Sequence, residues 1–201
     1  MKINKEVIEK IGSVTLPRVI AISGFGGSGK SSVAKAIGQA IDAPVISVDS
    51  FQKDGAFDTQ YSLWEIMDFD RLEKEVLKPF LKGQTIIKYG RFNVPSKSIS
   101  ETIEINSNGT LIIEGVGLFR PKLHKYLTYK IWIDVPLEVA IARGKKRDKD
   151  EFHSPADGCW DGIWKENDIQ YFDAFKPKDA ADLIIQNLDD NQKIPSISLM
   201  G

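Results

Sequence analysis

Short apolar runs alternate with amphipathic stretches along the whole chain. Five runs rich in β-branched residues predict strands, at 19–23, 45–48, 111–113, 131–133 and 183–185. These runs lack the alternation of polar and apolar residues that marks a half-exposed strand, so we expect each strand to be covered on both faces.

Helical patterns lie between the predicted strands. In 30–41 the apolar residues recur with helical spacing, and the same spacing returns in 68–82. A third helix is predicted over 136–147, where Pro136 stands at the helix start and its missing N–H costs nothing. Strands that alternate with helices predict βαβ crossovers and an α/β fold of three layers, with a mainly parallel sheet flanked by helices.

Three segments depart from this rhythm. Residues 84–105 contain two strand-like stretches around a Pro/Ser turn, which predicts a β-hairpin inserted into the α/β core. Residues 145–162 are highly charged and then rich in Gly, Pro and Asp, so we expect a mobile segment between helices. The tail at 189–201 has no helical pattern and is expected to fray. No linker divides the chain, which predicts one domain over 1–201.

Composition narrows the class of protein. The 201 residues carry 27 Lys and Arg against 28 Asp and Glu, so the net charge is −1, and 42% of them are hydrophobic. This balance argues against disorder and against a broadly basic nucleic-acid surface. A single cysteine, Cys159, excludes an intramolecular disulfide and a cysteine-based zinc cluster. The first residues lack the apolar core of a signal peptide, and no apolar run is long enough to span a membrane. We therefore expect a soluble, cytoplasmic protein.

A glycine-rich motif follows the first predicted strand and precedes the first long helix. Residues 24–31 fit G-x-x-x-x-G-K-[ST], whose glycines let successive backbone N–H groups point at phosphate oxygens. Lys30 is expected to contact the β- and γ-phosphates, and Ser31 to bind Mg²⁺. The predicted nucleotide-binding residues are Gly24, Phe25, Gly26, Gly27, Ser28, Gly29, Lys30, Ser31 and Ser32.

Acidic residues end three of the predicted strands. These are Asp49, Glu114 and Asp134. Ligands of parallel sheets bind outside the carboxyl ends of the strands, so acids on strands beside the first would point at the γ-phosphate and its metal. Phosphoryl transfer uses one acid at the metal and another that accepts the proton of the attacking hydroxyl. Asp49 and Glu114 are the candidates, whereas Asp134 precedes Val-Pro and is expected at a turn.

Together these motifs resemble the uridine kinase branch of the uridine kinase/phosphoribulokinase family of P-loop kinases. GFGGSGKSS (24–32) resembles the family's phosphate loop, and DSFQK (49–53) its D-S-F-Y-K motif. DFD (68–70), followed by a helix and Gly83, resembles its F-D segment, and IKY (87–89) its V-Y-D-F stretch. LIIEGVGLF (111–119) is similar to its metal-side strand, RGKKRD (143–148) to the start of its lid, and ADLII (181–185) to its last strand. The resemblance covers about 18–187.

The resemblance implies a P-loop kinase fold with an inserted hairpin at about 84–105 and a lid at about 143–165. It implies an ATP- and Mg²⁺-dependent kinase that phosphorylates a nucleoside 5′-hydroxyl, such as that of uridine or cytidine. The catalytic residues would be Asp49 as base, Lys30, Arg143 and Arg147, and the metal ligands Ser31 and Glu114. The acceptor-binding residues would be Asp49, Phe51, Lys53, Tyr89 and Arg91.

The acceptor end departs from the family's pattern. YGRFNVP (89–95) lacks the histidine that contacts the pyrimidine in uridine kinases, and LWEIMDFD (63–70) replaces D-H-P-D-A-F-D. Ala140 stands where the family has a further lid arginine. The acceptor therefore stays open between a nucleoside, nicotinamide riboside, pantothenate and a sugar-like alcohol, and the donor between ATP and GTP.

The second half of the predicted lid carries an aromatic stripe. The spacing of Trp160, Trp164 and Tyr171 predicts that they share one face of a helix. We expect this stripe to pack on the core, and the alternative is that one ring stacks on adenine or on the acceptor.

Two other functions compete with a kinase. A nucleotide-binding regulator would be expected to lack the base or the metal-side acid, yet both Asp49 and Glu114 are present. An NTPase acting on nucleic acid would be expected to have a basic face, which the net charge of −1 does not favour. The expected partner is a small-molecule substrate, with no nucleic acid and no membrane, and a homo-oligomer is left open.

Overall fold

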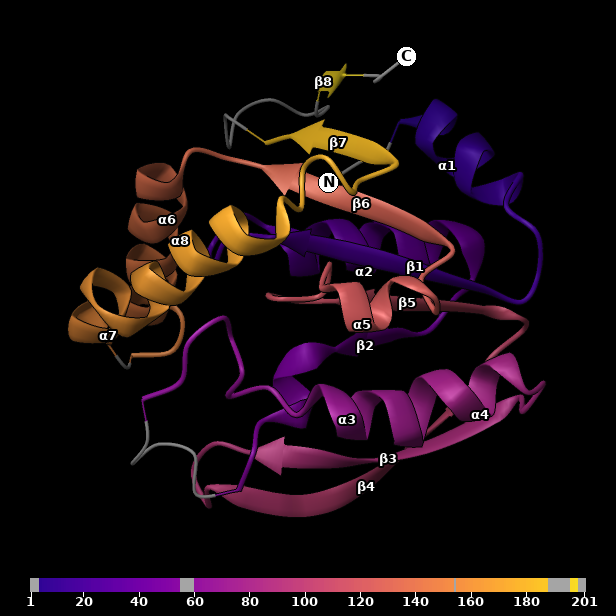
Figure 1. Cartoon of the computed structure of the whole chain (residues 1–201), viewed down its shortest axis with the longest axis horizontal. Helices are drawn as coiled ribbons and strands as arrows, with labels where there is room; N and C mark the ends of the chain where they lie inside the picture. The colour runs from indigo at the N-terminus through magenta and orange to yellow at the C-terminus, as the bar shows by residue number, and fades with distance from the viewer. Residues whose placement is uncertain (1–3, 55–59, 154, 188–195, 199–201) are drawn as a thin grey trace.

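One twisted sheet forms the centre of the molecule. The structure is a computed structural model that describes residues 4–54, 60–153, 155–187 and 196–198. Among these residues, six strands form the sheet in the order β2 (Val45–Ser47), β5 (Thr110–Glu114), β1 (Arg18–Gly24), β6 (Tyr129–Asp134), β7 (Leu183–Gln186) and β8 (Ser196–Ser198). The first five are parallel, and β8 is antiparallel to β7 (Figure 1). The predicted parallel sheet is confirmed.

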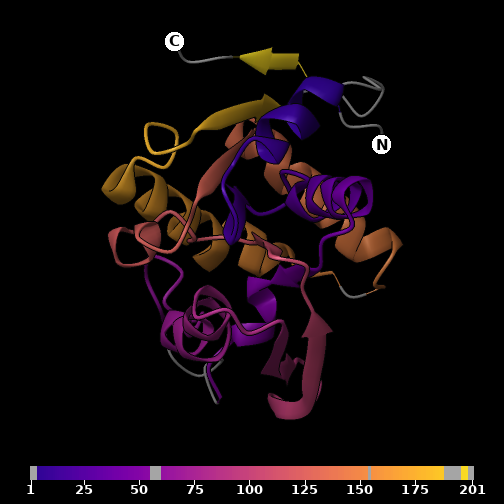
Figure 2. The same ribbon diagram turned by 90° about the vertical axis from the view of Figure 1, so that its right-hand side faces the viewer.

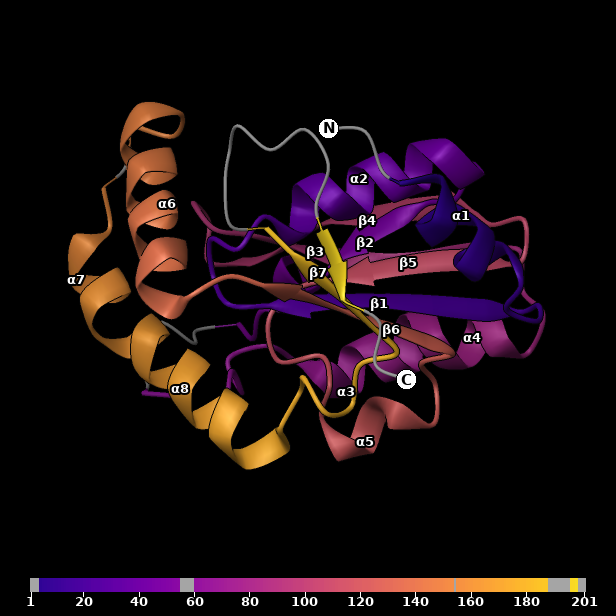
Figure 3. The same ribbon diagram turned by 90° about the horizontal axis from the view of Figure 1, so that it is seen from above.

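Helices cover both faces of the sheet, as predicted for a three-layer fold. Helix α2 (Lys30–Ile41) lies on one face, and α5 (Pro121–His124) and α8 (Ile163–Phe175) lie on the other (Figures 2 and 3). Helix α1 (Lys5–Gly12) lies on the side of α2. Helices α6 (Leu137–Asp150), α7 (Asp157–Asp161) and α8 gather beyond the carboxyl ends of the parallel strands (Figure 1). The glycine-rich segment that joins β1 to α2 lies at the same end of the sheet.

The two central strands β5 and β1 are buried along almost their whole length, as their continuous apolar runs predict, whereas β6 is buried only at Ile131–Ile133. All five residues of β5 are buried, and so is β1 except for its first residue. The β2 strand differs because it lies at the edge of the sheet, where Val45 is 37% exposed. It also ends one residue earlier than predicted, and Val48–Phe51 forms a 3₁₀ turn instead. The prediction that every strand is covered on both faces is therefore wrong for β2.

The helix predicted over 68–82 is present with a widened middle. It begins as α3 (Phe69–Arg71), continues as a π-helical segment (Leu72–Leu77) and ends as α4 (Lys78–Leu81). The N–H of Lys78 donates to the carbonyl of Glu73, five residues earlier. Pro79, the next residue, has no backbone N–H and so cannot donate the usual α-helical hydrogen bond to the carbonyl four residues earlier. The wider turn therefore lies directly before a position where the helix lacks one of its regular hydrogen bonds.

The predicted hairpin is confirmed. Strands β3 (Ile86–Asn93) and β4 (Ser98–Asn106) pair antiparallel, with an irregularity in register between Arg91 and Phe92. Figure 1 shows the hairpin beside the helix α3–α4, away from the β7 edge of the main sheet. Alternate β3 side chains, among them Ile87 and Tyr89, are buried.

Two expectations about irregular segments are wrong. Much of 145–162 is helical, because α6 continues to Asp150 and α7 occupies Asp157–Asp161; Ser154 lies outside the described residues. The charged stretch can stay helical because α7 packs on α6, where a Cβ on Gly144 would lie 2.3 Å from Trp160. The tail expected to fray contains β8, which pairs with β7, while the rest of 189–201 lies outside the described residues.

Candidate active site

The glycine-rich loop joins the end of β1 to the start of α2. Gly27 and Gly29 have φ angles of 80° and 95°, in the left-handed region that favours glycine. A Cβ on Gly27 would also lie only 2.0 Å from the carbonyl oxygen of Ala140 on α6. The loop therefore packs against α6 too closely for any side chain at this position.

Lys30 is the first residue of α2 and is buried at the centre of the candidate site. Its Nζ donates to the carbonyl oxygen of Phe25, 2.8 Å away, within the same loop. Burial lowers the pKa of Lys30, and the carboxylates of Glu114, Asp168 and Asp49 oppose that effect. The cation thus lies among three acids, of which sequence analysis predicted Glu114 and Asp49.

The pKa values of the two predicted acids are raised. Protein packed around Asp49 removes part of its hydration and raises the pKa of its carboxyl, although the residue keeps an exposed surface, and Lys30 opposes the shift. Glu114 is 5% exposed. Burial raises its pKa, Lys30 lowers it, the charge of Asp49 adds to the rise, and hydrogen bonds from Ser47 and Ser31 lower it.

The oxygen donors beside Lys30 suit a magnesium ion that a nucleotide brings with it. Ser31 hydrogen-bonds to the Glu114 carboxylate, so a hydroxyl and a carboxylate meet at the end of the phosphate loop. Across the described part of the chain, no group of three or more His, Cys, Asp or Glu side chains could hold a metal alone. Mg²⁺ is commonly bound by one or two carboxylates together with substrate phosphates and water, and these residues fit that pattern.

The two predicted lid arginines differ in their surroundings. Arg147 on α6 contributes positive charge at both Lys30 and Asp49, and it also pairs with Asp148. Arg143 donates to the carbonyl oxygen of Asn187, 2.7 Å away, just beyond β7. The structure therefore places the charge of Arg147 near the predicted base and ties Arg143 to the end of a strand.

The predicted acceptor-binding residues lie on the 3₁₀ turn, on β3 and, for Lys53, in the loop just after the turn. Phe51 of the 3₁₀ turn stacks on Tyr89 of β3 with a centroid distance of 5.3 Å, and it has no exposed surface. Lys53 lies over the ring of Tyr61, with its Nζ 5.0 Å from the centroid. Arg91 is exposed on the hairpin and pairs with Glu101. Phe51 therefore supports the ring of Tyr89 from the buried side.

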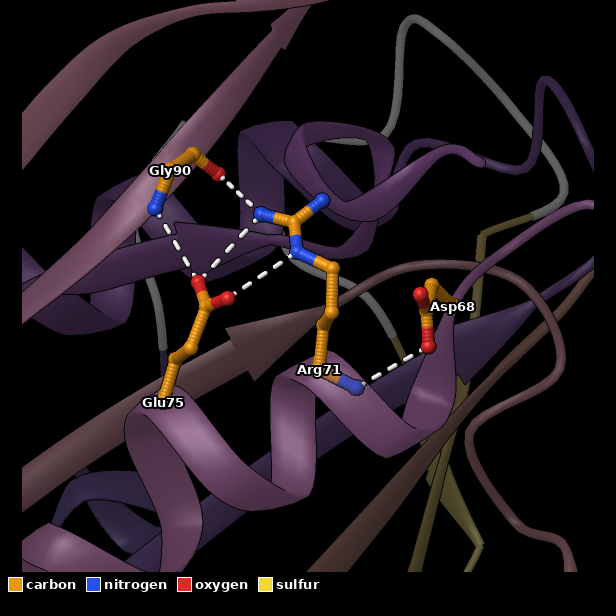
Figure 4. Close-up of polar contacts among 4 residues, drawn as sticks. All are labelled: Asp68, Arg71, Glu75 and Gly90. Carbon is orange, nitrogen blue, oxygen red and sulfur yellow. Dashed lines mark hydrogen bonds and ion pairs between the residues drawn. The ribbon is translucent and has the colours of Figure 1, made fainter. Parts of the chain in front are cut away.

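A bridge of polar contacts fastens the hairpin to the helix beside it (Figure 4). Glu75 accepts from the N–H of Gly90 at 3.0 Å, and Arg71 donates to the carbonyl oxygen of the same residue at 2.6 Å. The two side chains also bind each other, with Arg71 Nε 3.0 Å from Glu75 Oε1. The Arg71 guanidinium lies 5.3 Å from the centroid of Phe51. The contacts thus connect the helix, the hairpin and the 3₁₀ turn that carries Asp49.

The aromatic stripe packs inward, as expected, but it does not lie on one helix, because α7 ends at Asp161 and α8 begins at Ile163. Trp160 and Tyr171 are buried, and Trp164 packs on Trp160 with centroids 4.9 Å apart. The Trp160 indole donates to Asp148 at 2.7 Å, and a Cβ on Gly26 would lie 3.0 Å from the Trp160 ring. Trp160 is therefore part of the wall behind the phosphate loop.

Several residues of this wall were missed by sequence analysis. Asp168 accepts from the N–H of Gly26 at 2.8 Å, and Asn187 donates to the carbonyl oxygen of Ser28 at 2.9 Å. Asn187 stands just after β7, so a broader rule that counted amide side chains after the strands, and not acids alone, would have found it. Asp168 lies in the middle of a helix, where no local pattern marks it.

The fold and this loop define the class. A parallel sheet whose first strand runs into a phosphate loop, with Lys30 facing acids from neighbouring elements, is the architecture of a P-loop kinase. Within the described residues, no helix is long and apolar enough to cross a membrane.

Comparison with known proteins names the family. The model of the phosphoribulokinase/uridine kinase family matches residues 19–193, so the chain belongs to that family. A uridine kinase of Saccharomyces cerevisiae is 32% identical over 194 residues, which cover 88% of this chain and 38% of that protein. The chain thus spans about two fifths of the length of that relative. A uridine kinase of Borrelia duttonii is 27% identical, and the match covers 88% of this chain and 89% of that protein.

Solved structures agree on the fold. A protein described as a possible uridine kinase from Bacillus stearothermophilus superposes with a TM-score of 0.66 at 18% identity. The superposition covers 89% of this chain and 95% of that one. The predicted P-loop kinase fold is confirmed.

Proposed function

We propose that the protein is an ATP- and Mg²⁺-dependent kinase that phosphorylates a hydroxyl of a small molecule, with the 5′-hydroxyl of uridine or cytidine as the leading acceptor. The observation that carries the proposal is the cluster around Lys30. There the phosphate loop, the 3₁₀ turn after β2 and the end of β5 bring one cation and two acids together. The names of the sequence relatives support a nucleoside acceptor.

In this mechanism Lys30 neutralises charge on the transferring phosphoryl group, and the loop N–H groups orient it. Asp49 accepts the proton of the acceptor hydroxyl. Its raised pKa makes it a stronger base than an ordinary aspartate. It can act as a base only when ionised, which requires a pH above that pKa. When bound, Mg²⁺ supplies further neutralisation of phosphate charge, and Ser31 and Glu114 are the residues that would hold it.

The lid contributes the remaining positive charge. Arg147 already faces Lys30 and Asp49, and we propose that it contacts the phosphates. Arg143 would have to release the carbonyl of Asn187 to join it. Exclusion of water by these residues favours transfer to the acceptor over hydrolysis.

A coupled assay of ADP release from Mg·ATP tests the proposal. The acceptors are uridine, cytidine, nicotinamide riboside, pantothenate and a set of simple sugars, each run with wild-type protein and with Asp49→Asn. We expect one acceptor to stimulate release, and Asp49→Asn to lower that rate by about 10²–10⁴, the usual contribution of a positioned base. Asp42→Asn, an exposed aspartate just after α2, is the matched control and should retain wild-type activity.

The pH dependence provides a second test. Because the pKa of Asp49 is raised, kcat should increase with pH through that pKa, and Asp49→Asn should lose this limb. Full activity of Asp49→Asn would remove Asp49 from the role of base. Mg·ATP binding without stimulation by any acceptor would contradict the proposed nucleoside and favour a regulator that binds nucleotide.

A further inference from the structure

Asp168 connects two parts of the site that are far apart in sequence. It lies on α8 and is 2% exposed. Its Oδ2 accepts from the backbone N–H of Gly26 in the phosphate loop at 2.8 Å. Its Oδ1 accepts from the indole N–H of Trp64 at 2.9 Å, so one carboxylate binds both segments.

The segment that carries Trp64 is held in a strained conformation. Leu63 and Trp64 have φ angles of 54° and 59°, in the left-handed region that non-glycine residues rarely adopt. The N–H of Trp64 donates to Asn167 at 2.6 Å, and Arg120 donates to the carbonyl oxygen of Leu63 at 2.7 Å. Such strain persists only where surrounding contacts impose it, and here they come mainly from α8.

The chemistry of the bridge requires a carboxylate. Both partners of Asp168 are N–H donors, and an ionised carboxylate offers only acceptor oxygens. An asparagine would direct an NH₂ group at one of the two donors. A protonated carboxyl group would likewise give up one good acceptor, so the complete bridge belongs to the ionised form.

Few charged or titratable groups face this carboxylate. Lys30 of α2 attracts it, and Tyr171 on the same helix as Asp168 also interacts with it. Burial raises the pKa of Asp168 to about 6, while Lys30 and the donors on Gly26 and Trp64 lower it. The bridge therefore weakens as the pH falls through about 6.

We propose that Asp168 is a positioning residue that holds the phosphate loop and the strained 63–64 turn in register, so that nucleotide binding at the loop is transmitted to the acceptor side through the Trp64 indole. This inference rests on the proposed function, because it assumes that the loop binds a nucleotide. Asp168 is expected to touch neither the phosphates nor the acceptor.

The Trp64 indole N–H is a direct reporter of the bridge. In ¹⁵N-labelled protein its cross-peak is assigned with Trp→Phe variants, and it is followed from pH 5 to pH 7.5 with and without saturating Mg·ADP. In the wild type we expect this peak to titrate with a midpoint near pH 6 and to shift when Mg·ADP binds. In Asp168→Asn the titration should vanish, and the Mg·ADP shift should fall to less than half.

The controls separate the bridge from its surroundings. Asp173→Asn, an exposed aspartate on the same helix, should behave as the wild type. The Trp160 indole, which donates to Asp148 and whose ring lies beside Gly26, reports nucleotide binding at the phosphate loop without belonging to the bridge. Calorimetry should show that Asp168→Asn still binds Mg·ADP.

A Trp64 peak that does not titrate, or that shifts equally with Mg·ADP in the wild type and in Asp168→Asn, would overturn the inference. If Asp168→Asn does not fold, the wild-type titration and the Mg·ADP shift still decide it. Absence of Mg·ADP binding to the wild type would instead contradict the proposed function, while the nucleotide-free titration would still test the bridge.

Discussion

The phosphate end and the acceptor end of the site are built in different ways. The phosphate end is built mainly from the backbone of the glycine-rich loop, and a Cβ at Gly27 would collide with the backbone of α6. At the acceptor end, side chains make the connecting contacts, as when Arg71 and Glu75 bind each other and the backbone of Gly90 in the hairpin (Figure 4). A backbone-built site follows a short motif, whereas a site built from side chains can change its partners, which suits the end that selects the acceptor.

Removing the charge at the phosphate end should have the largest effect. Lys30→Ala leaves the loop backbone in place but deletes the buried cation, so phosphoryl transfer should fall by about 10³ or more, the scale at which single cations act in such sites. The measurement is acceptor-dependent ADP release. Lys35→Ala, an exposed lysine on the same helix, should leave the rate unchanged. A similar loss in both variants would point to damage of α2 rather than to loss of phosphate neutralisation.

Asp168, which contacts both the phosphate loop and Trp64, should make the free energy of unfolding depend on pH. The pKa of Asp168 rises from 3.8 to about 6 on folding, so the native state binds more protons than the unfolded state between these values. The contribution of Asp168 to stability therefore decreases as the pH rises through this window, by about 2 kcal/mol between pH 4.5 and pH 7.5. Urea unfolding of wild type and Asp168→Asn measures it.

As the pH rises from 4.5 to 7.5, the wild type should lose about 2 kcal/mol of unfolding free energy relative to Asp168→Asn. Other acids with raised pKa values, such as Asp49 and Glu114, are present in both proteins and cancel in this comparison. A difference that does not change with pH would show that Asp168 titrates alike in the folded and unfolded chains.

The smallest effect is expected at the acceptor end. Glu75→Gln keeps the shape of the side chain but weakens its bonds to Arg71 and Gly90, which should lower the unfolding free energy by about 1 kcal/mol. We expect KM for the acceptor to rise while Mg·ADP affinity stays the same. Glu104→Gln, whose exposed side chain pairs with Lys88 on the hairpin, is the control and should change neither. Weaker Mg·ADP binding in Glu75→Gln would show that the two ends are not separable in this way.

Much of the architecture was predictable because it depends on local patterns. Continuous apolar runs located the parallel strands, and helical spacing placed α2 at its observed residues. The failures share a cause. The charged stretch after Gly144 is helical because Trp160 packs against it, and β8 forms because β7 offers it an edge. Neither partner is adjacent in sequence, so no local pattern indicated the pairing.

The candidate site divides along the same line. The sequence determined the phosphate loop, Lys30 and the strand-end acids Asp49 and Glu114, because parallel strands bring their carboxyl ends to one edge by topology. Only the tertiary structure revealed the contact of Asp168 with Gly26 and the strained turn at 63–64. A buried acid in mid-helix acquires its role from donors that other segments present to it, and the chain must fold before those donors meet.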